Sequence, residues 1–193
     1  NVPLNNNGKD QAKKASEYLN EIKFNKAFSS SMDRPYETAK IILQNKSDIE
    51  ITKVENLVEI SHGLWEGKLE NEINEKWPKL LKNWHEKPEE VIMPEGECIG
   101  EVSNRSVKAW EEICLTQKNK DLTLLVAHDA VNKTLICNIL GIDYSNIWMI
   151  KQGNGGITII DLFDDPQKDH VISALNITAH LGGVLDSTAA GAL

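Results

Sequence analysis

The feature that most constrains the fold is the alternation of short apolar segments with longer amphipathic ones. Short runs rich in β-branched and aromatic residues predict strands, whereas apolar residues at helical spacing predict helices. Asp33 is expected to cap one helix and Gly141 to end another. The expected strands cover residues 24–31, 48–57, 121–128, 155–163 and 170–177. The expected helices cover residues 9–22, 33–45, 99–117 and 130–141, with a further helix within residues 70–97 that breaks around Pro78.

Strands that alternate with helices predict an α/β fold, a three-layer sandwich in which helices cover both faces of a mostly parallel sheet. A chain of 193 residues has the length of one such domain, so residues 1–193 are expected to form a single domain. Folds of this class place their ligands at the carboxyl ends of the strands. Ser29 to Ser31 follow one expected strand and His128 ends another. These side chains are therefore expected at one edge of the sheet.

The charge balance limits the classes of partner. The formal net charge is -8 and the isoelectric point is near 5.2. Nucleic acids and anionic membrane surfaces bind clustered lysine and arginine, so neither is expected as a partner, and the oligomeric state is left open. No apolar run approaches the ~18 residues of a spanning helix, and no signal peptide opens the chain. The three cysteines form no C-x-x-C pair, so the expected location is the cytoplasm.

Three polar side chains near the ends of these segments are candidates for a binding site. His128 ends the strand "LLVAH", although a histidine there could simply bond a neighbouring carbonyl. Arg34 opens the helix after "FSSS", where a guanidinium and helix N–H groups can face one anion. The alternative for Arg34 is a surface pair with Glu37. Glu59 stands between an apolar pair and a glycine-rich loop, and its alternative is a solvated carboxylate.

Several segments taken together resemble the histidine phosphatase superfamily, the phosphoglycerate mutase-like proteins. The resemblance runs in the family's order from Val2 to about Ile160, and the order makes it specific where any one segment would be weak. The matching segments are "PLNNNGKDQA", "FSSSMDRPYETA", "LVEISHGLWEG", "PEGEC", "LLVAHDAV" and "GNGGITII".

The resemblance implies a reaction and a role for each matching residue. Family members transfer a phosphoryl group to a histidine nucleophile and then to water, or in mutases back to the substrate. His128 would be the second histidine of the pocket and Arg34 its second arginine, both of which stabilise the phosphoryl oxygens. Glu59 would be the general acid, and Asn154 would line the pocket. No metal or other cofactor is implied, because cationic side chains supply the electrostatic stabilisation.

The chain departs from the family's pattern at three places. The Arg-His-Gly motif that carries the nucleophile is absent, since none of the five histidines stands in it, and it is expected upstream with the first strand of the sheet. The complete protein is therefore expected to be an enzyme, and these 193 residues alone to be inactive. Cys98 stands where serine is usual. Asp129 replaces the usual glycine, and is expected either to cap the next helix and point outward or to bind a complementary group of the substrate.

Within the family, "AHDAVNKTLICNILG" and "GNGGITIIDLF" look most like the plant and cyanobacterial 2-carboxy-D-arabinitol-1-phosphatase-like branch. This likeness implies a phosphatase acting on a small phosphorylated metabolite, such as a sugar or sugar-acid phosphate. A phosphoglycerate mutase and a non-catalytic, phosphate-binding remnant are the alternatives. A metal site at Glu59 and His62 is not expected, because no third ligand stands at a recognisable spacing. Trp77 and Trp84 lie in a segment expected to cover the pocket, where a lid can set substrate choice.

Overall fold

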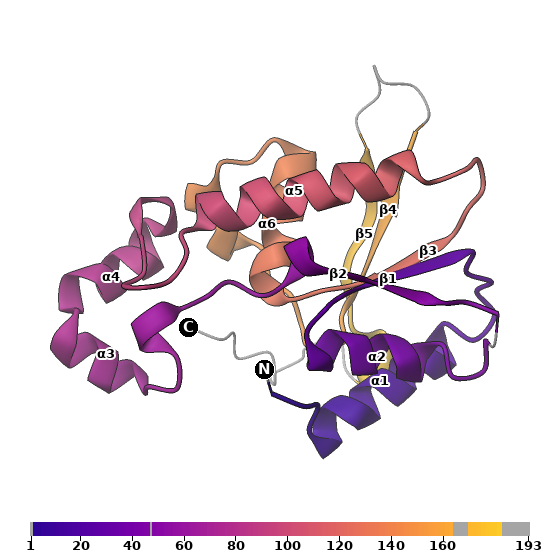
Figure 1. Ribbon diagram of the computed structural model, residues 1–193, viewed down its shortest axis with the longest axis horizontal. Coiled ribbons are helices and arrows are strands. Elements are labelled where there is room, and N and C mark those ends of the chain that lie inside the picture. Colours follow the sequence, from indigo (N-terminus) through magenta and orange to yellow (C-terminus); the bar gives the residue numbers. More distant parts are fainter. Residues whose placement is uncertain (1, 47, 164–169, 183–193) are drawn as a thin grey trace.

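A computed structural model describes residues 2–46, 48–163 and 170–182 (Figure 1). The main sheet contains three parallel strands in the order β2-β1-β3, and β4 and β5 form a separate antiparallel pair. All strands that the sequence predicts are present, each over a shorter range than expected. They are β1 (Lys26–Ser30), β2 (Ile51–Val54), β3 (Thr123–Val126), β4 (Ile157–Asp161) and β5 (Val171–Ile177).

Helices cover both faces of the main sheet, as expected. Figure 1 shows α1 and α2 on one side of the strands, and α5 and α6 on the other. The α-helices are α1 (Asn6–Tyr18), α2 (Asp33–Ile42), α3 (Glu70–Lys76), α4 (Pro78–Glu86), α5 (Ile99–Leu115) and α6 (Asp129–Leu140). Short 3₁₀ helices lie between them: η1 (Glu55–Leu57), η2 (Gly63–Trp65), η3 (Pro88–Glu90), η4 (Tyr144–Met149) and η5 (Ala179–Leu181).

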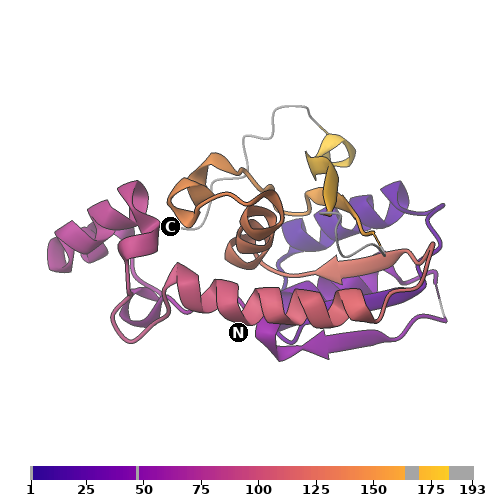
Figure 2. The same cartoon turned by 90° about the horizontal axis from the view of Figure 1, so that it is seen from above.

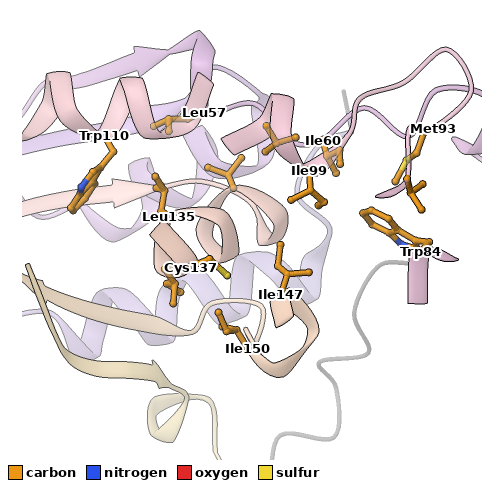
Figure 3. Close-up of a cluster of buried hydrophobic side chains, with 14 of the residues drawn as sticks. Leu57, Ile60, Trp84, Met93, Ile99, Trp110, Leu135, Cys137, Ile147 and Ile150 are labelled. Atoms are coloured by element: carbon orange, nitrogen blue, oxygen red, sulfur yellow. The ribbon is translucent and has the colours of Figure 1, made fainter. Parts of the chain in front are cut away.

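The alternation of side chains along the strands explains the two layers of helices. Ala27 and Leu124 point to the side of α1 and α2, where they join a small apolar cluster. The next residues, Phe28 and Leu125, point to the opposite side and pack against the larger core of α5 and α6. Successive residues of a strand face opposite sides of a sheet, so a short apolar strand serves both cores. Figure 3 shows part of the larger cluster, including Trp110.

A helical excursion extends the larger core beyond the end of the sheet. Helices α3 and α4 project at the end of the molecule where α5 begins (Figures 1 and 2). The expected break occurs at Pro78, which is the first residue of α4 and therefore needs no N–H partner. Trp84 of α4 is only 1% exposed and belongs to the larger core. The excursion is thus held against the core by Trp84, an aromatic side chain that lines the same small cavity as Glu59.

The helix ends agree only in part with the sequence predictions. Helix α1 begins three residues earlier than expected, because the side chain of Asn5 caps it by accepting a hydrogen bond from Gly8 N at 2.8 Å. The prediction that Asp33 caps α2 is wrong: Met32 occupies the cap, and Asp33 is the first helical residue. Gly141 ends α6 as expected, with a φ of 64° that favours glycine.

Candidate active site

Parallel strands β1 and β3 bring a serine and a histidine together at their carboxyl ends. Their register pairs Ser29 with Val126, so the residues that follow lie side by side. His128 Nε2 is 3.0 Å from the hydroxyl oxygen of Ser30, and the exposed fraction of His128 is 7%. This contact confirms the expected meeting of the serine segment and the histidine at one edge of the sheet. His128 is also the residue that caps α6.

The surroundings of His128 favour its neutral imidazole form. Burial, together with the positive charges of Arg34 and Arg105, lowers the pKa of His128 to about 4. Burial disfavours the charged form of a base, and nearby cations do the same. A neutral histidine near the exposed cation of Arg34 leaves a positive region that an anion can neutralise.

Arg34 lies in the first turn of α2 and is exposed to solvent. Arg34 does not form the surface pair with Glu37 that was considered from the sequence. The Glu37 carboxylate instead forms an ion pair with Lys9 Nζ, at 3.1 Å. Within residues 2–46, 48–163 and 170–182, Arg34 has no salt-bridge partner. Arg34 follows β1, the strand that pairs with β3, and its positive charge contributes to the lowered pKa of His128.

Glu59 lies in the loop after η1, where its carboxyl group is largely removed from water. Burial raises the pKa of Glu59, and the negative charge of Asp129 raises it further. The N–H groups of Ile60, Ala130 and Asp129 oppose this rise, and Ile60 N donates to Glu59 Oε1 at 3.0 Å. A carboxyl group with a raised pKa can retain a proton closer to neutral pH, which is what a general acid requires.

A half-buried arginine that the sequence did not single out holds the loop that carries Glu59. Arg105 of α5 donates hydrogen bonds to three backbone carbonyls of this loop, those of Asn56 (3.0 Å), Val58 (2.7 Å) and Glu59 (3.1 Å). The same guanidinium makes a two-pronged contact with Glu97, at 2.8 and 3.0 Å. The bidentate geometry of a guanidinium suits this fixed frame. We call Arg105 and Glu97 the loop brace.

Glu97 completes the loop brace from the other side. Its Oε2 atom accepts a hydrogen bond from Ser61 N at 2.9 Å, and its own N–H donates to the Ser61 carbonyl at 2.9 Å. Although burial opposes the effect, Arg105 holds the pKa of Glu97 below its usual value. Sequence spacing carried no signal for this pair, because its separation of eight residues exceeds the i,i+3 and i,i+4 spacings at which side chains of one helix meet.

A small cavity lies directly beside Glu59. Its volume is about 20 Å³, which gives space for about one water molecule. Side chains from the Glu59 loop, α4, α5, α6 and η4 meet around it. The lining residues are Glu59, Ile60, His62, Trp84, Ile99, Asp129, Ala130, Lys133, Ile147 and Trp148. Trp84, which the sequence marked as a residue of the covering segment, is therefore part of the wall.

The expectation that Asp129 caps α6 and points outward is wrong. His128 occupies the cap because β3 ends at Val126, so Asp129 becomes the first residue of the helix. Its Oδ2 atom pairs with Lys133 Nζ at 2.8 Å, one helical turn later, and the residue lines the cavity. The structure thus turns Asp129 toward Glu59.

The structure does not bring Asn154 to this cavity. Asn154 is exposed in the turn before β4, and the adjacent Gly155 faces Gln11 of α1 and Leu181. Its expected role in the pocket stays a prediction. Among the residues that the structure describes, no group of three or more histidine, cysteine, aspartate or glutamate side chains is placed to hold a metal ion. None of the described helices is long and apolar enough to cross a membrane.

Ser30→Ala and Ser29→Ala form a matched pair that tests the histidine contact. Both hydroxyls are buried, but Ser29 donates to the Ser30 carbonyl at 2.8 Å, whereas Ser30 contacts His128. We expect Ser30→Ala to change the ¹⁵N shifts of His128, and Ser29→Ala to leave them unchanged. In the unliganded protein, NMR titration should show His128 neutral until the pH falls to about 4. Protonation near the ordinary imidazole value would contradict this geometry.

Comparison with known proteins decides the family. The sequence model of the histidine phosphatase superfamily (branch 1) matches residues 1–174. This chain belongs to the histidine phosphatase superfamily. Phosphoserine phosphatase 1 of Hydrogenobacter thermophilus is 33% identical over 179 residues, which cover 93% of this chain and 82% of that protein. The 2-carboxy-D-arabinitol-1-phosphatase of Triticum aestivum is 30% identical and covers 82% of this chain, but this histidine phosphatase chain spans only 32% of the wheat protein.

Solved structures place this histidine phosphatase in the same fold. YhfR of Bacillus stearothermophilus superposes with a TM-score of 0.86 at 22% identity, covering 94% of this chain and 88% of that one. A mycobacterial glucosyl-3-phosphoglycerate phosphatase, solved with inorganic phosphate, superposes with a TM-score of 0.82 at 22% identity, over 92% of this chain and 89% of that one. The mixed α/β architecture with a parallel sheet is therefore confirmed.

Proposed function

We propose that the complete protein is a metal-independent phosphatase that hydrolyses a small phosphorylated metabolite through a phosphohistidine intermediate. The observation that carries the proposal is the combination at one edge of the sheet: a neutral buried His128 near Arg34, and a carboxyl group of Glu59 whose pKa is raised. Such a site pairs cationic stabilisation of an anion with a proton donor. The names of its relatives, phosphoserine phosphatase and 2-carboxy-D-arabinitol-1-phosphatase, support the same reaction class.

Each residue of the site has a defined role in this proposal. His128 and Arg34 bind the phosphoryl oxygens and stabilise the charge that they carry in the transition state. A histidine from an Arg-His-Gly segment attacks phosphorus, and the bond from phosphorus to the leaving oxygen breaks. Glu59 gives its proton to that oxygen, so the product leaves as an alcohol. Water then attacks the phosphohistidine and transfers a proton to the carboxylate of Glu59, which restores the acid and releases phosphate.

The nucleophile segment is proposed to form a strand beside β3. Within the described residues β3 pairs with β1 on one edge, and its other edge is available for a parallel neighbour. A strand there would end at the same edge of the sheet as His128. Asn154 and Asp129 are proposed as further substrate contacts, and residues 1–193 as part of a single domain. We also propose a cytoplasmic location, since the cysteines Cys98, Cys114 and Cys137 are unpaired.

Hydrolysis of p-nitrophenyl phosphate by the full reading frame tests this function. We expect release of nitrophenol that persists in excess EDTA, and no turnover by the 193 residues alone. Absence of hydrolysis by the full reading frame, with or without EDTA, would contradict the proposal and favour a phosphate-binding remnant. Isomerisation of 3-phosphoglycerate without release of phosphate would instead show a mutase.

A further inference from the structure

The cavity beside Glu59 contains an ion pair that takes no part in the proposed phosphoryl transfer, with Lys133 buried and the Asp129 side chain 30% exposed. Lys133 is 7% exposed, and its Nζ atom lies 2.8 Å from Asp129 Oδ2. The same ammonium group lies 5.0 Å from the centre of the Trp148 ring. A lysine is rarely buried unless its charge is paired, and this one has both a carboxylate and an aromatic face as partners. Its charge is therefore already neutralised before any substrate arrives.

The wall around this pair is held in place by two tryptophans. Trp148 Nε1 donates a hydrogen bond to the backbone carbonyl of Trp84 at 2.8 Å. The two rings meet edge to face with their centroids 5.0 Å apart, and the His62 ring contacts Trp84 in the same way. Edge-to-face contacts of this kind favour one relative orientation. The wall thus links α4 to η4 across the cavity.

One of the two carboxylate oxygens of Asp129 lacks a hydrogen-bond donor among the described residues around this cavity. Its Oδ2 atom binds Lys133, whereas its Oδ1 atom is buried and accepts no hydrogen bond from any residue that the structure describes. A buried acceptor without a donor costs free energy, which a bound donor would recover. The carboxylate is also close enough to Glu59 to raise the pKa of that acid. A donor on the leaving group of a substrate could therefore reach Asp129 while Glu59 protonates the leaving oxygen.

The size of the cavity limits what can enter it. A volume of about 20 Å³ accommodates a group of one heavy atom, comparable to a water molecule. An ammonium or hydroxyl group meets this limit, whereas a carboxylate or a second phosphate does not. Electrostatics favour the same choice, because the paired Lys133 offers no free positive charge to a second anion.

From this geometry we propose that Asp129 and Lys133 form a subsite that selects the leaving group of the substrate. The subsite accepts an ammonium or hydroxyl group, which donates a hydrogen bond to Asp129 Oδ1, and it disfavours a leaving group that carries a second anion. This inference rests on the proposed phosphatase function and narrows its substrates to phosphomonoesters of amino or polyhydroxy alcohols.

Two phosphate monoesters of similar length, whose distal groups carry opposite charges, test the subsite. Phosphoethanolamine carries an ammonium group where phosphoglycolate carries a carboxylate. With the full reading frame, we expect kcat/KM to be about tenfold or more higher for phosphoethanolamine, which is the size of effect expected for a hydrogen bond to a charged group. An equal or higher value for phosphoglycolate would overturn the inference.

Two variants should move this ratio of kcat/KM values in opposite directions. Asp129→Asn removes the acceptor charge and frees the Lys133 ammonium, so we expect the ratio to fall about tenfold. Lys133→Met removes the ammonium and leaves the carboxylate for the substrate, so the ratio should rise. Both probes are measured on the same sample, so a loss of folded protein lowers both rates together and leaves the ratio unchanged. A ratio that neither variant moves would overturn the subsite.

Hydrolysis of p-nitrophenyl phosphate separates failure of this inference from failure of the proposed function. If the wild-type protein hydrolyses p-nitrophenyl phosphate but does not prefer phosphoethanolamine, only the subsite is wrong. If it hydrolyses none of the three compounds, the phosphatase function is wrong, and the subsite is overturned with it.

Discussion

Glu59→Gln is expected to lower kcat for an alkyl phosphate such as phosphoethanolamine by about 10²- to 10⁴-fold. Glutamine keeps the size of the side chain but cannot transfer a proton to the leaving alkoxide. The loss should be much smaller for p-nitrophenyl phosphate, because nitrophenolate is a good leaving group that needs little protonation. Steady-state kinetics on both substrates measure the difference. Equal losses on the two compounds would show that Glu59 positions the phosphate and does not act as the general acid.

The raised pKa of Glu59 predicts how the same variant responds to pH. In the wild-type protein, kcat/KM for an alkyl phosphate should fall as the pH rises through the raised pKa, because the proton donor is lost. Glu59→Gln should lack this decrease. The stability of the wild-type protein should also fall as the pH rises, because ionising a buried carboxyl group above its unfolded-state pKa destabilises the fold. We therefore expect Glu59→Gln to raise the Tm at about pH 8, and the gain to disappear near about pH 4.

Arg105→Ala is expected to destabilise the protein by about 3 kcal/mol, since it leaves the carboxylate of Glu97 and three loop carbonyls without their shared donor. For a domain of this size, such a loss corresponds to a fall in Tm of roughly 6–12 °C. The turnover number should fall as well, because the loop that carries Glu59 loses its anchor on α5. Arg105→Lys should recover little of the lost stability or turnover number, because one ammonium group cannot reproduce the bidentate contact together with the carbonyl contacts.

Lys82→Ala provides the matched control for the loop brace. Lys82 lies 3.8 Å from Glu86, and both side chains are largely exposed, at 69% and 61%. An exposed pair of this kind contributes within about 0.5 kcal/mol, so this variant should unfold at the wild-type temperature. Thermal and chemical denaturation compare the two variants. If Arg105→Ala unfolds like Lys82→Ala, the contacts of Arg105 do not hold the loop.

The meeting of His128 with the serine segment could be predicted from the sequence. Apolar strands that end on polar residues place those residues at a common edge once the strands are parallel, and no detail of packing is needed. The end of α6 at Gly141 could also be predicted, because glycine readily adopts the left-handed backbone conformation that ends many helices. Family motifs added roles for Arg34 and Glu59 that spacing alone does not provide.

The loop brace and the direction of Asp129 could not be read in the same way. Arg105 bonds carbonyls that lie 46 to 49 residues earlier in the chain, so its partners exist only after the loop has packed on α5. Asp129 is not the helix cap that the sequence suggested, because β3 ends at Val126 and α6 begins one residue earlier than expected. His128 therefore takes the cap position. The spacing of Asp129 and Lys133 is that of an ion pair on one helix face, a signal that the sequence did contain.

A crystal structure of the full reading frame with orthovanadate tests the central claim most directly. Vanadate mimics the phosphoryl group in transfer, so the site should bind it at the carboxyl edge of the sheet. We expect vanadate within hydrogen-bonding distance of His128 and Arg34, with the carboxyl group of Glu59 facing the oxygen that represents the leaving group. Vanadate bound elsewhere, with His128 still bonded to Ser30 and Glu59 facing no ligand, would contradict it.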